Sequence, residues 1–175
     1  MTDSHEQITA RMDDPREREA IELACRILDK KAGSKYIILV PFAKKIAGNK
    51  QEIEIYSDDG DIILLSRDLK LIQAVEVKRL SETNFMAHFQ DRKSWTLPNF
   101  IIDGVWQFKN KKVKVYMYMC FNAPMTWAAI IYPAKTIEHW KKETKAGNGT
   151  QKEYYVVNPD LIIFKSVKEL LDAKD

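Results

Sequence analysis

The chain has 175 residues and a mass of 20.4 kDa, the size of one domain with a full hydrophobic core. Its composition, 45% hydrophobic and 30% charged, gives no sign of global disorder, and its apolar runs are too short to cross a bilayer, so we expect no membrane partner. The net charge of +3 excludes a polycation that binds nucleic acid by bulk charge, but it leaves a local basic face open.

The organisation of the chain predicts a tail followed by one folded unit. Residues 1–12 show no hydrophobic period, and we expect them to form a flexible tail. Residues 13–175 contain no internal repeat and no linker long enough to divide them, so we expect a single domain. The first residues lack the features of a secretory signal, and Cys25 and Cys120 resemble neither a metal site nor a disulfide framework. These features predict a cytoplasmic protein.

The folded unit is expected to begin with a helix. Asp14 can cap a helix, Pro15 suits the first helical position, and Glu17 stands where the acid of a capping box would stand. Apolar residues then recur at helical spacing until Gly33, which favours a helix end. We therefore expect a helix over about residues 15–31.

An antiparallel meander is expected in the next part of the chain. Residues 36–40 are ambiguous between a buried strand and a helix that Pro41 interrupts. Residues 52–56, 62–65 and 71–80 then have the alternating or apolar patterns of strands, and turn residues separate them. These three segments are expected to form the meander.

The second half of the chain has weaker patterns. Residues 81–99 look irregular, apart from a short helical turn near residues 86–89. After them we expect, in chain order, a hairpin of strands 100–108 and 113–121, a helix over 136–146, strands over 154–157 and 161–164, and a helix over 167–173.

The chemistry-bearing residues lie in the expected meander. Side chains alternate along a strand, so Glu76 and Lys78 share one face while Val75 and Val77 turn toward the core. Asp61 opens the preceding strand, and an antiparallel neighbour can bring its carboxylate beside Glu76. Two carboxylates at that distance repel each other unless a cation lies between them. Hard oxygen ligands suit Mg²⁺, and we expect Mn²⁺ to substitute for it.

A lysine two residues after such a carboxylate has a use in the same site. Lys78 can hold or help deprotonate a metal-bound water, or stabilise charge on a phosphate, which suits the hydrolysis of a phosphodiester. A second Glu-x-Lys, at residues 143–145, lies in a polar stretch where nothing would anchor it. The alternative interpretation of Glu76 and Lys78 is an ordinary solvent-facing pair on a half-exposed sheet.

This arrangement resembles a known superfamily. An acid, a strand, a turn and a strand with Glu-x-Lys, all after an N-terminal helix, resemble the PD-(D/E)xK nucleases. Within that superfamily the local likeness is to the archaeal Holliday junction resolvases, whose first helix opens with a Glu-Arg-Glu stretch like residues 17–19 here. The resemblance covers about residues 15–80, and Gly60 stands where the signature has proline. It implies an α/β fold with a restriction-endonuclease-like core, in which an N-terminal helix precedes a mixed central sheet with flanking helices.

The resemblance also implies roles for individual residues. It matches Asp61 and Glu76 to the metal carboxylates and Lys78 to the catalytic lysine, and it makes the backbone carbonyl of Val77 a further metal ligand. Glu17 matches the acid of the helix, which supports the metal directly or through water. The helical wheel independently places Glu17 on the face turned toward the protein, although completing the capping box is an alternative role. The implied activity is that of a Mg²⁺-dependent endo- or exodeoxyribonuclease that hydrolyses phosphodiester bonds in DNA.

The likeness to the resolvases ends near residue 80, which leaves the substrate open. Junction, repair, restriction-like and phage nucleases all remain candidates, RNA is not excluded as substrate, and a homodimer stays open. Four lysines at the tip of the expected hairpin can neutralise phosphates, and we expect them to bind nucleic acid: Lys109, Lys111, Lys112 and Lys114. No Gly-rich phosphate loop is present, so no nucleotide cofactor is expected.

Two further hypotheses compete with the nuclease. The first is a catalytically inactive module that keeps the nuclease fold and binds nucleic acid or a partner protein. The second is an α+β interaction domain in which Glu76 and Lys78 are surface residues.

Overall fold

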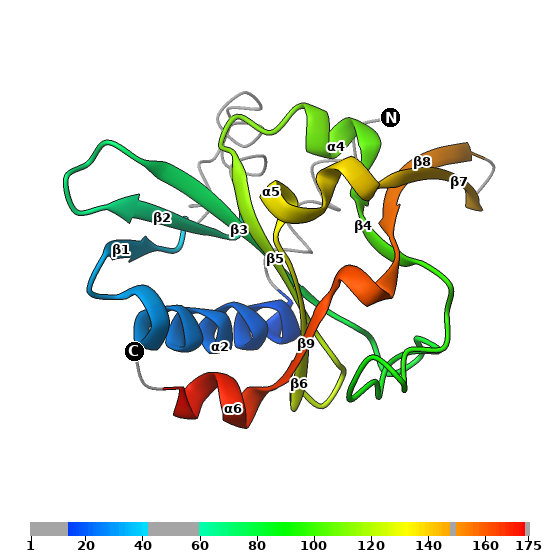
Figure 1. Cartoon of the computed structure of the whole chain (residues 1–175), viewed down its shortest axis with the longest axis horizontal. Helices are drawn as coiled ribbons and strands as arrows, with labels where there is room; N and C mark the ends of the chain where they lie inside the picture. The colour runs from blue at the N-terminus through cyan, green and yellow to red at the C-terminus, as the bar shows by residue number, and fades with distance from the viewer. Residues whose placement is uncertain (1–13, 42–59, 148–149, 174–175) are drawn as a thin grey trace.

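The computed structural model describes residues 14–41, 60–147 and 150–173 of the chain (Figure 1). The expected tail over residues 1–12 and the expected strand over residues 52–56 lie outside the described residues.

The described residues form helices and strands in the following order. The helices are α2 (Pro15–Ala32), α4 (Val105–Lys109), α5 (Pro133–Thr136) and α6 (Val167–Asp172), with 3-10 turns at Ile137–His139 and Pro159–Leu161. The strands are β1 (Tyr36–Leu39), β2 (Ile62–Ser66), β3 (Ile72–Arg79), β4 (Phe100–Gly104), β5 (Val115–Phe121), β6 (Trp127–Ile131), β7 (Lys141–Gly147), β8 (Thr150–Val157) and β9 (Ile163–Ser166).

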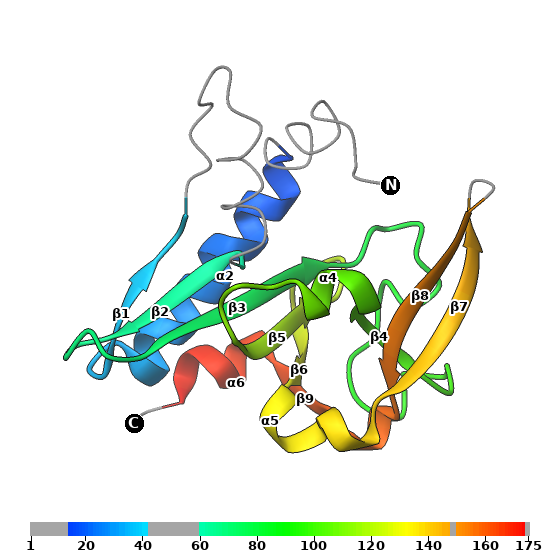
Figure 2. The same cartoon turned by 90° about the horizontal axis from the view of Figure 1, so that it is seen from above.

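The strands form two sheets. The larger sheet has the order β1-β2-β3-β5-β6-β9, and all its neighbouring pairs are antiparallel except β3 and β5, which are parallel. The smaller sheet has the order β4-β8-β7 and is antiparallel. The fold is therefore mixed α/β, with a helix followed by a mixed sheet. The β1 edge and the β7–β8 hairpin lie at opposite ends of the molecule (Figures 1 and 2).

Helix α2 follows the local signals of its sequence. The carboxylate of Asp14 accepts a hydrogen bond from the N–H of Arg16 at 2.9 Å, Pro15 begins the helix, and Gly33 follows its last residue. The residues that α2 buries recur at helical spacing: Ala20, Ala24, Ile27 and Leu28. The predicted helix is confirmed, with an end one residue later than expected.

Around β3 and β5, both faces of the larger sheet are covered. Helices α2 and α6 lie on one face, while α4, α5 and the smaller sheet lie on the other side of β3 and β5 (Figure 1). Two hydrophobic cores result, one between the larger sheet and helices α2 and α6, the other between the larger sheet, β4, β8 and segment 81–99. On β5, Met117 and Met119 pack in the first of these cores, whereas Tyr118 and Cys120 pack in the second. Tyr118 is only 2% exposed, so this part of β5 has no surface face. Cys25 and Cys120 are both free thiols.

The hairpin predicted over residues 100–121 is wrong. β4 pairs with β8 in the smaller sheet, and β5 pairs with β3 and β6 in the larger one. The chain turns into helix α4 after Gly104, so β4 does not continue to residue 108 as expected. The partner of β4 is more than 40 residues later in the chain, and the turn-like lysine stretch carries no information about it.

The helix predicted over residues 136–146 is also wrong. This segment contains the end of α5, the 3-10 turn at Ile137–His139 and strand β7, which pairs with β8. Trp140, between the 3-10 turn and β7, packs its ring against Phe108 and Tyr155, with centroid distances of 5.1 and 5.6 Å. Pairing with β8 and these ring contacts override the local helical pattern. The expected strands near residues 154–157 and 161–164 and the last helix are confirmed, with shifted ends.

Asn122 holds the irregular segment 81–99 against the sheet. It follows β5 and is only 1% exposed. Its Nδ2 donates to the carbonyl of Phe89 at 2.9 Å, and its Oδ1 accepts from the N–H groups of Thr126 and Trp127 at 2.8 and 3.1 Å. One amide thus ties the β5–β6 turn to a loop more than 30 residues earlier.

We predict that Asn122→Ala lowers the free energy of unfolding by on the order of 3 kcal/mol, because one buried and two part-buried backbone groups lose their partner together. Urea unfolding followed by circular dichroism measures the loss. The control is Asn110→Ala, since the Asn110 amide is exposed and donates only to the carbonyl of Trp106, and it should change stability by less than about 0.5 kcal/mol. Equal losses in the two variants would show that Asn122 has no special structural role.

Candidate active site

The register of β2 and β3 brings the two predicted carboxylates together. Ile62 lies opposite Val75 in this antiparallel pair, so the next position outward places Asp61 beside Glu76. Ile62 and Val75 are fully buried in the core under α2, and alternation turns Asp61 and Glu76 toward the other face. On that face the neighbour of Glu76 across the parallel pair is Tyr118 of β5.

Gly60, directly before Asp61, has a backbone conformation that requires glycine. Its φ is +101°, which a proline ring cannot adopt. A Cβ at this position would lie 2.7 Å from the Cβ of Ala74 and 3.3 Å from Oε1 of Glu76. The backbone therefore approaches the site so closely, just before Asp61, that glycine is required there.

Asp61 is held in place from β3. Its Oδ2 accepts a hydrogen bond of 2.7 Å from the N–H of Val77. Burial, together with the nearby charge of Glu76, raises the pKa of Asp61 to about 7 against the opposing effects of the Val77 N–H and Lys111. The contact of Val77 with Asp61 is through its amide, and the role of its carbonyl as a metal ligand stays a prediction.

A third carboxylate and a lysine complete the cluster. The Nζ of Lys111 lies 2.7 Å from Oε1 of Glu76 and 3.6 Å from Oδ2 of Asp103. The hydroxyl of Tyr118 donates to the same Oδ2 of Asp103 at 2.9 Å. The side chains are mostly buried, with 9% of Lys111 and 13% each of Glu76 and Asp103 exposed. Because of the two carboxylates, the pKa of Lys111 lies above its ordinary value although burial lowers it.

Sequence reasoning missed Asp103 and placed Lys111 differently. Asp103 lies on β4, two residues after the exposed Ile101 and directly after the buried Ile102. An acid within such an apolar strand was the available signal. Lys111 was expected at an exposed hairpin tip, but it turns inward from the loop between α4 and β5 to reach Glu76.

Lys78 shares the face of Glu76, as predicted, but its ammonium is directed elsewhere. It donates a hydrogen bond to the backbone carbonyl of Ile102 on β4. It also lies 5.7 Å from the centroid of the Tyr118 ring. Among the described residues, no carboxylate forms an ion pair with Lys78.

Glu17 lies near enough to act on the cluster electrostatically. Its charge contributes to the raised pKa of Asp61, after burial and Glu76. Its side chain is exposed, however, rather than turned into the protein as the helical wheel suggested. The reason is its position in the first turn of α2, before Ala20, the first residue that the helix buries.

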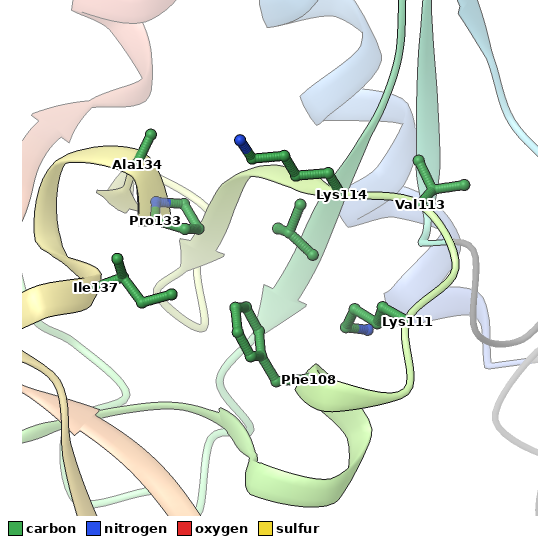
Figure 3. Close-up of a pocket in the computed structure, with 8 residues that line it drawn as sticks. Phe108, Lys111, Val113, Lys114, Pro133, Ala134 and Ile137 are labelled. Carbon is green, nitrogen blue, oxygen red and sulfur yellow. The ribbon is translucent and has the colours of Figure 1, made fainter.

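The other predicted lysines lie outside the cluster. Lys109, Lys112 and Lys114 are exposed, at the end of α4, in the following loop and just before β5. Lys111 and Lys114 line a pocket of about 280 Å³ between α4, β5 and α5 (Figure 3). Its remaining lining is apolar: Phe108, Val113, Val115, Pro133, Ala134 and Ile137.

No metal site is formed in the described part of the chain. Within residues 14–41, 60–147 and 150–173, no three His, Cys, Asp or Glu side chains are arranged to hold a metal ion. The positive charge beside Glu76 is the ammonium of Lys111. Asp61 and Glu76 nevertheless have the chemistry of a hard-cation site, because they are neighbouring oxygen donors whose repulsion a divalent cation would relieve.

Comparison with known proteins provides no relative for this chain. No family model, curated protein or solved structure matches it. In the part of the chain that the structure describes, no helix is long and apolar enough to span a membrane.

We predict a pH-dependent stability difference between the wild type and Asp61→Asn in a chelating buffer. The unfolded Asp61 carboxyl releases its proton near pH 4, whereas the folded one holds it to about pH 7. The folded state therefore binds more protons between these values, and this carboxyl makes the wild type less stable as pH rises through them. From about pH 5 to about pH 8, Asp61→Asn should gain on the order of 2 kcal/mol relative to the wild type.

Urea unfolding at both pH values measures this difference. Asp91→Asn is the matched control, because hydrogen bonds from Ser94 hold the pKa of Asp91 below its ordinary value. The Asp91 carboxyl is ionised in both states over this range, so its variant should follow the pH profile of the wild type. A profile of Asp61→Asn parallel to the wild type would contradict the raised pKa.

Proposed function

We propose that this protein is a metal-dependent nuclease that hydrolyses phosphodiester bonds in DNA. The observation that carries the proposal is the juxtaposition of Asp61 and Glu76 by the β2–β3 register, on a face that also presents lysines. Burial and, after it, the charge of Glu76 raise the pKa of Asp61 to about 7, as expected where two acids are neighbours in a largely buried site.

The fold supports the same proposal, with a restriction-endonuclease-like core as its architecture. Helix α2 precedes the antiparallel strands β2 and β3, which is the order that the resemblance to PD-(D/E)xK nucleases implies. In the resolvases a helix then leads to another strand. Here a turn-rich segment over residues 81–99, with β4 and α4 after it, leads to β5, which lies parallel to β3.

Asp61 and Glu76 are the residues that would hold Mg²⁺ or Mn²⁺. Glu17 would support the ion from α2, directly or through water, and the Val77 carbonyl would be a further ligand. When bound, such an ion supplies Lewis-acid stabilisation of the charge that develops on the phosphate. The hydrogen bond from the Val77 N–H to Oδ2 of Asp61 leaves the other carboxylate oxygen of Asp61 for this role.

The lysines of the chain would serve the negatively charged substrate. An ammonium beside the carboxylates stabilises charge on the phosphate and lowers its repulsion by Asp61 and Glu76. Exposed lysines near the site, Lys109, Lys112 and Lys114, would contact the nucleic-acid backbone farther from the reaction. DNA is the proposed partner, and RNA is the alternative substrate that a cleavage assay distinguishes.

A specific observation favours a second function. Lys111 already neutralises Glu76 and approaches Asp103, and the Lys78 ammonium is hydrogen-bonded to a backbone carbonyl. A cluster whose charges are satisfied within the protein suits a module that keeps the fold and binds nucleic acid or a partner protein without cleaving it.

Metal binding separates the two functions. We predict that the wild type binds Mn²⁺ in isothermal titration calorimetry, and that Asp61→Asn and Glu76→Gln each weaken this binding by at least about tenfold, because each removes one ligand charge. Glu143→Gln is the matched control, since Glu143 belongs to the second Glu-x-Lys and lies on β7. Binding that survives in Asp61→Asn and Glu76→Gln would support the inactive module.

Cleavage provides the functional test. With Mg²⁺ or Mn²⁺, the wild type should nick or cut plasmid, branched or single-stranded DNA, and Asp61→Asn should lose this activity while it keeps its fold by circular dichroism. The absence of cleavage across these DNA substrates and structured RNA would refute the nuclease.

The exposed lysines have their own test. Replacing Lys109, Lys112 and Lys114 together by methionine should lower the salt dependence of DNA binding by up to about three phosphate equivalents. Fluorescence anisotropy with a labelled duplex at several salt concentrations measures this slope. An unchanged slope would show that these lysines face away from the DNA.

A further inference from the structure

Lys111 is the lysine that belongs to the carboxylate cluster. Its ammonium lies 2.7 Å from Glu76 and 3.6 Å from Asp103, and its side chain is only 9% exposed. The Asp103 carboxylate is in turn held by the hydroxyl of Tyr118 at 2.9 Å. These contacts fix the position of the Lys111 charge beside the acids proposed to bind metal.

The ammonium of Lys78 makes a structural contact instead of an ion pair with the cluster. The hydrogen bond to the Ile102 carbonyl links β3 of the larger sheet to β4 of the smaller one. The ring of Tyr118, 5.7 Å away, lies on the same side of the sheet and further stabilises the ammonium. To reach a phosphate beside Glu76, Lys78 would have to give up this link between the two sheets.

A pocket gives access to Lys111. The side chains of Lys111 and Lys114 both line the 280 Å³ pocket, and the ammonium of Lys114 points away from Lys111, toward Ala134 (Figure 3). The rest of the wall is apolar, so these two ammonium groups are the charged groups of the pocket lining. The charge of Lys111 would attract a phosphate at this pocket and offset the repulsion by Glu76 and Asp103, with which the same ammonium interacts.

We propose that Lys111, and not Lys78, is the lysine that contacts the substrate phosphate in this site. The inference rests on the proposed nuclease function and replaces the residue that the Glu-x-Lys pattern indicates. Lys111 reaches the carboxylates from a loop outside that pattern, while Lys78 joins the two sheets. The substrate class is a phosphodiester whose neighbouring base or sugar lies against the apolar wall of the pocket.

The test compares Lys111→Met with Lys78→Met, and Lys145→Met serves as the exposed control from the second Glu-x-Lys. Lys111→Met should lower kcat for DNA cleavage by about two to four orders of magnitude, whereas Lys78→Met should lower it by less than about tenfold. Two readouts do not need cleavage. Lys111→Met should lower the salt slope of duplex binding in chelator by about one phosphate equivalent. It should also raise Mn²⁺ affinity by about tenfold, because an ammonium no longer competes for Glu76.

Lys111→Arg is the control for a folding defect in Lys111→Met, since it keeps a positive charge beside Glu76 and Asp103. It should retain the thermal melt and salt slope of the wild type while kcat falls, because the guanidinium has a different reach and shape. If Lys78→Met instead loses turnover and salt slope while Lys111→Met keeps both, the lysine assignment is overturned and the nuclease stands. A wild type that neither binds Mn²⁺ nor cleaves nucleic acid overturns the proposed function, and the assignment of Lys111 with it.

Discussion

The pairing register of β2 with β3 is the constraint on which the candidate site depends. Ile62 opposite Val75 anchors this register, because both side chains are fully buried under α2. Side chains alternate along a strand, so a slip of one residue would turn the carboxylate of Asp61 into the apolar core and Ile62 out of it. The core therefore selects the register, and the register brings Asp61 beside Glu76.

The charges assembled by this register are costly to bury. Glu76, Asp103 and Lys111 are each largely removed from water, and an ion pair in that setting recovers its desolvation cost only with further hydrogen bonds. Apolar side chains of similar volume would stabilise such a position as well or better, so stability alone does not account for the cluster. The proposed functions, phosphodiester hydrolysis or binding without cleavage, would account for it. Asp61 shows the same cost, because burial and, after it, the charge of Glu76 keep the pKa of its carboxyl raised despite the nearby ammonium.

The sequence by itself determined the parts of this protein that depend on near neighbours in the chain. The cap at Asp14, the proline after it and the helical spacing of apolar residues predict α2. Alternation and turn residues likewise predict β2 and β3, and with them the meeting of Asp61 and Glu76. Such signals act within a few residues, so they can be recognised in the sequence without knowledge of the fold. The residues of β1 are ambiguous in sequence, because a short apolar run fits a helix or a strand.

Only the tertiary structure decided which distant segments meet. β4 pairs with β8 rather than with β5, and β7 is a strand because β8 lies beside it, although its own pattern suggested a helix. Asp103 enters the site through that pairing, and Lys111 does so because its loop folds inward toward Glu76. Both depend on how the two sheets pack against each other, and no local pattern of charge or hydrophobicity encodes the direction in which a loop lysine points. The sequence therefore predicts that Asp61 and Glu76 are neighbours, but only the fold decides that Lys111 forms the ion pair with Glu76.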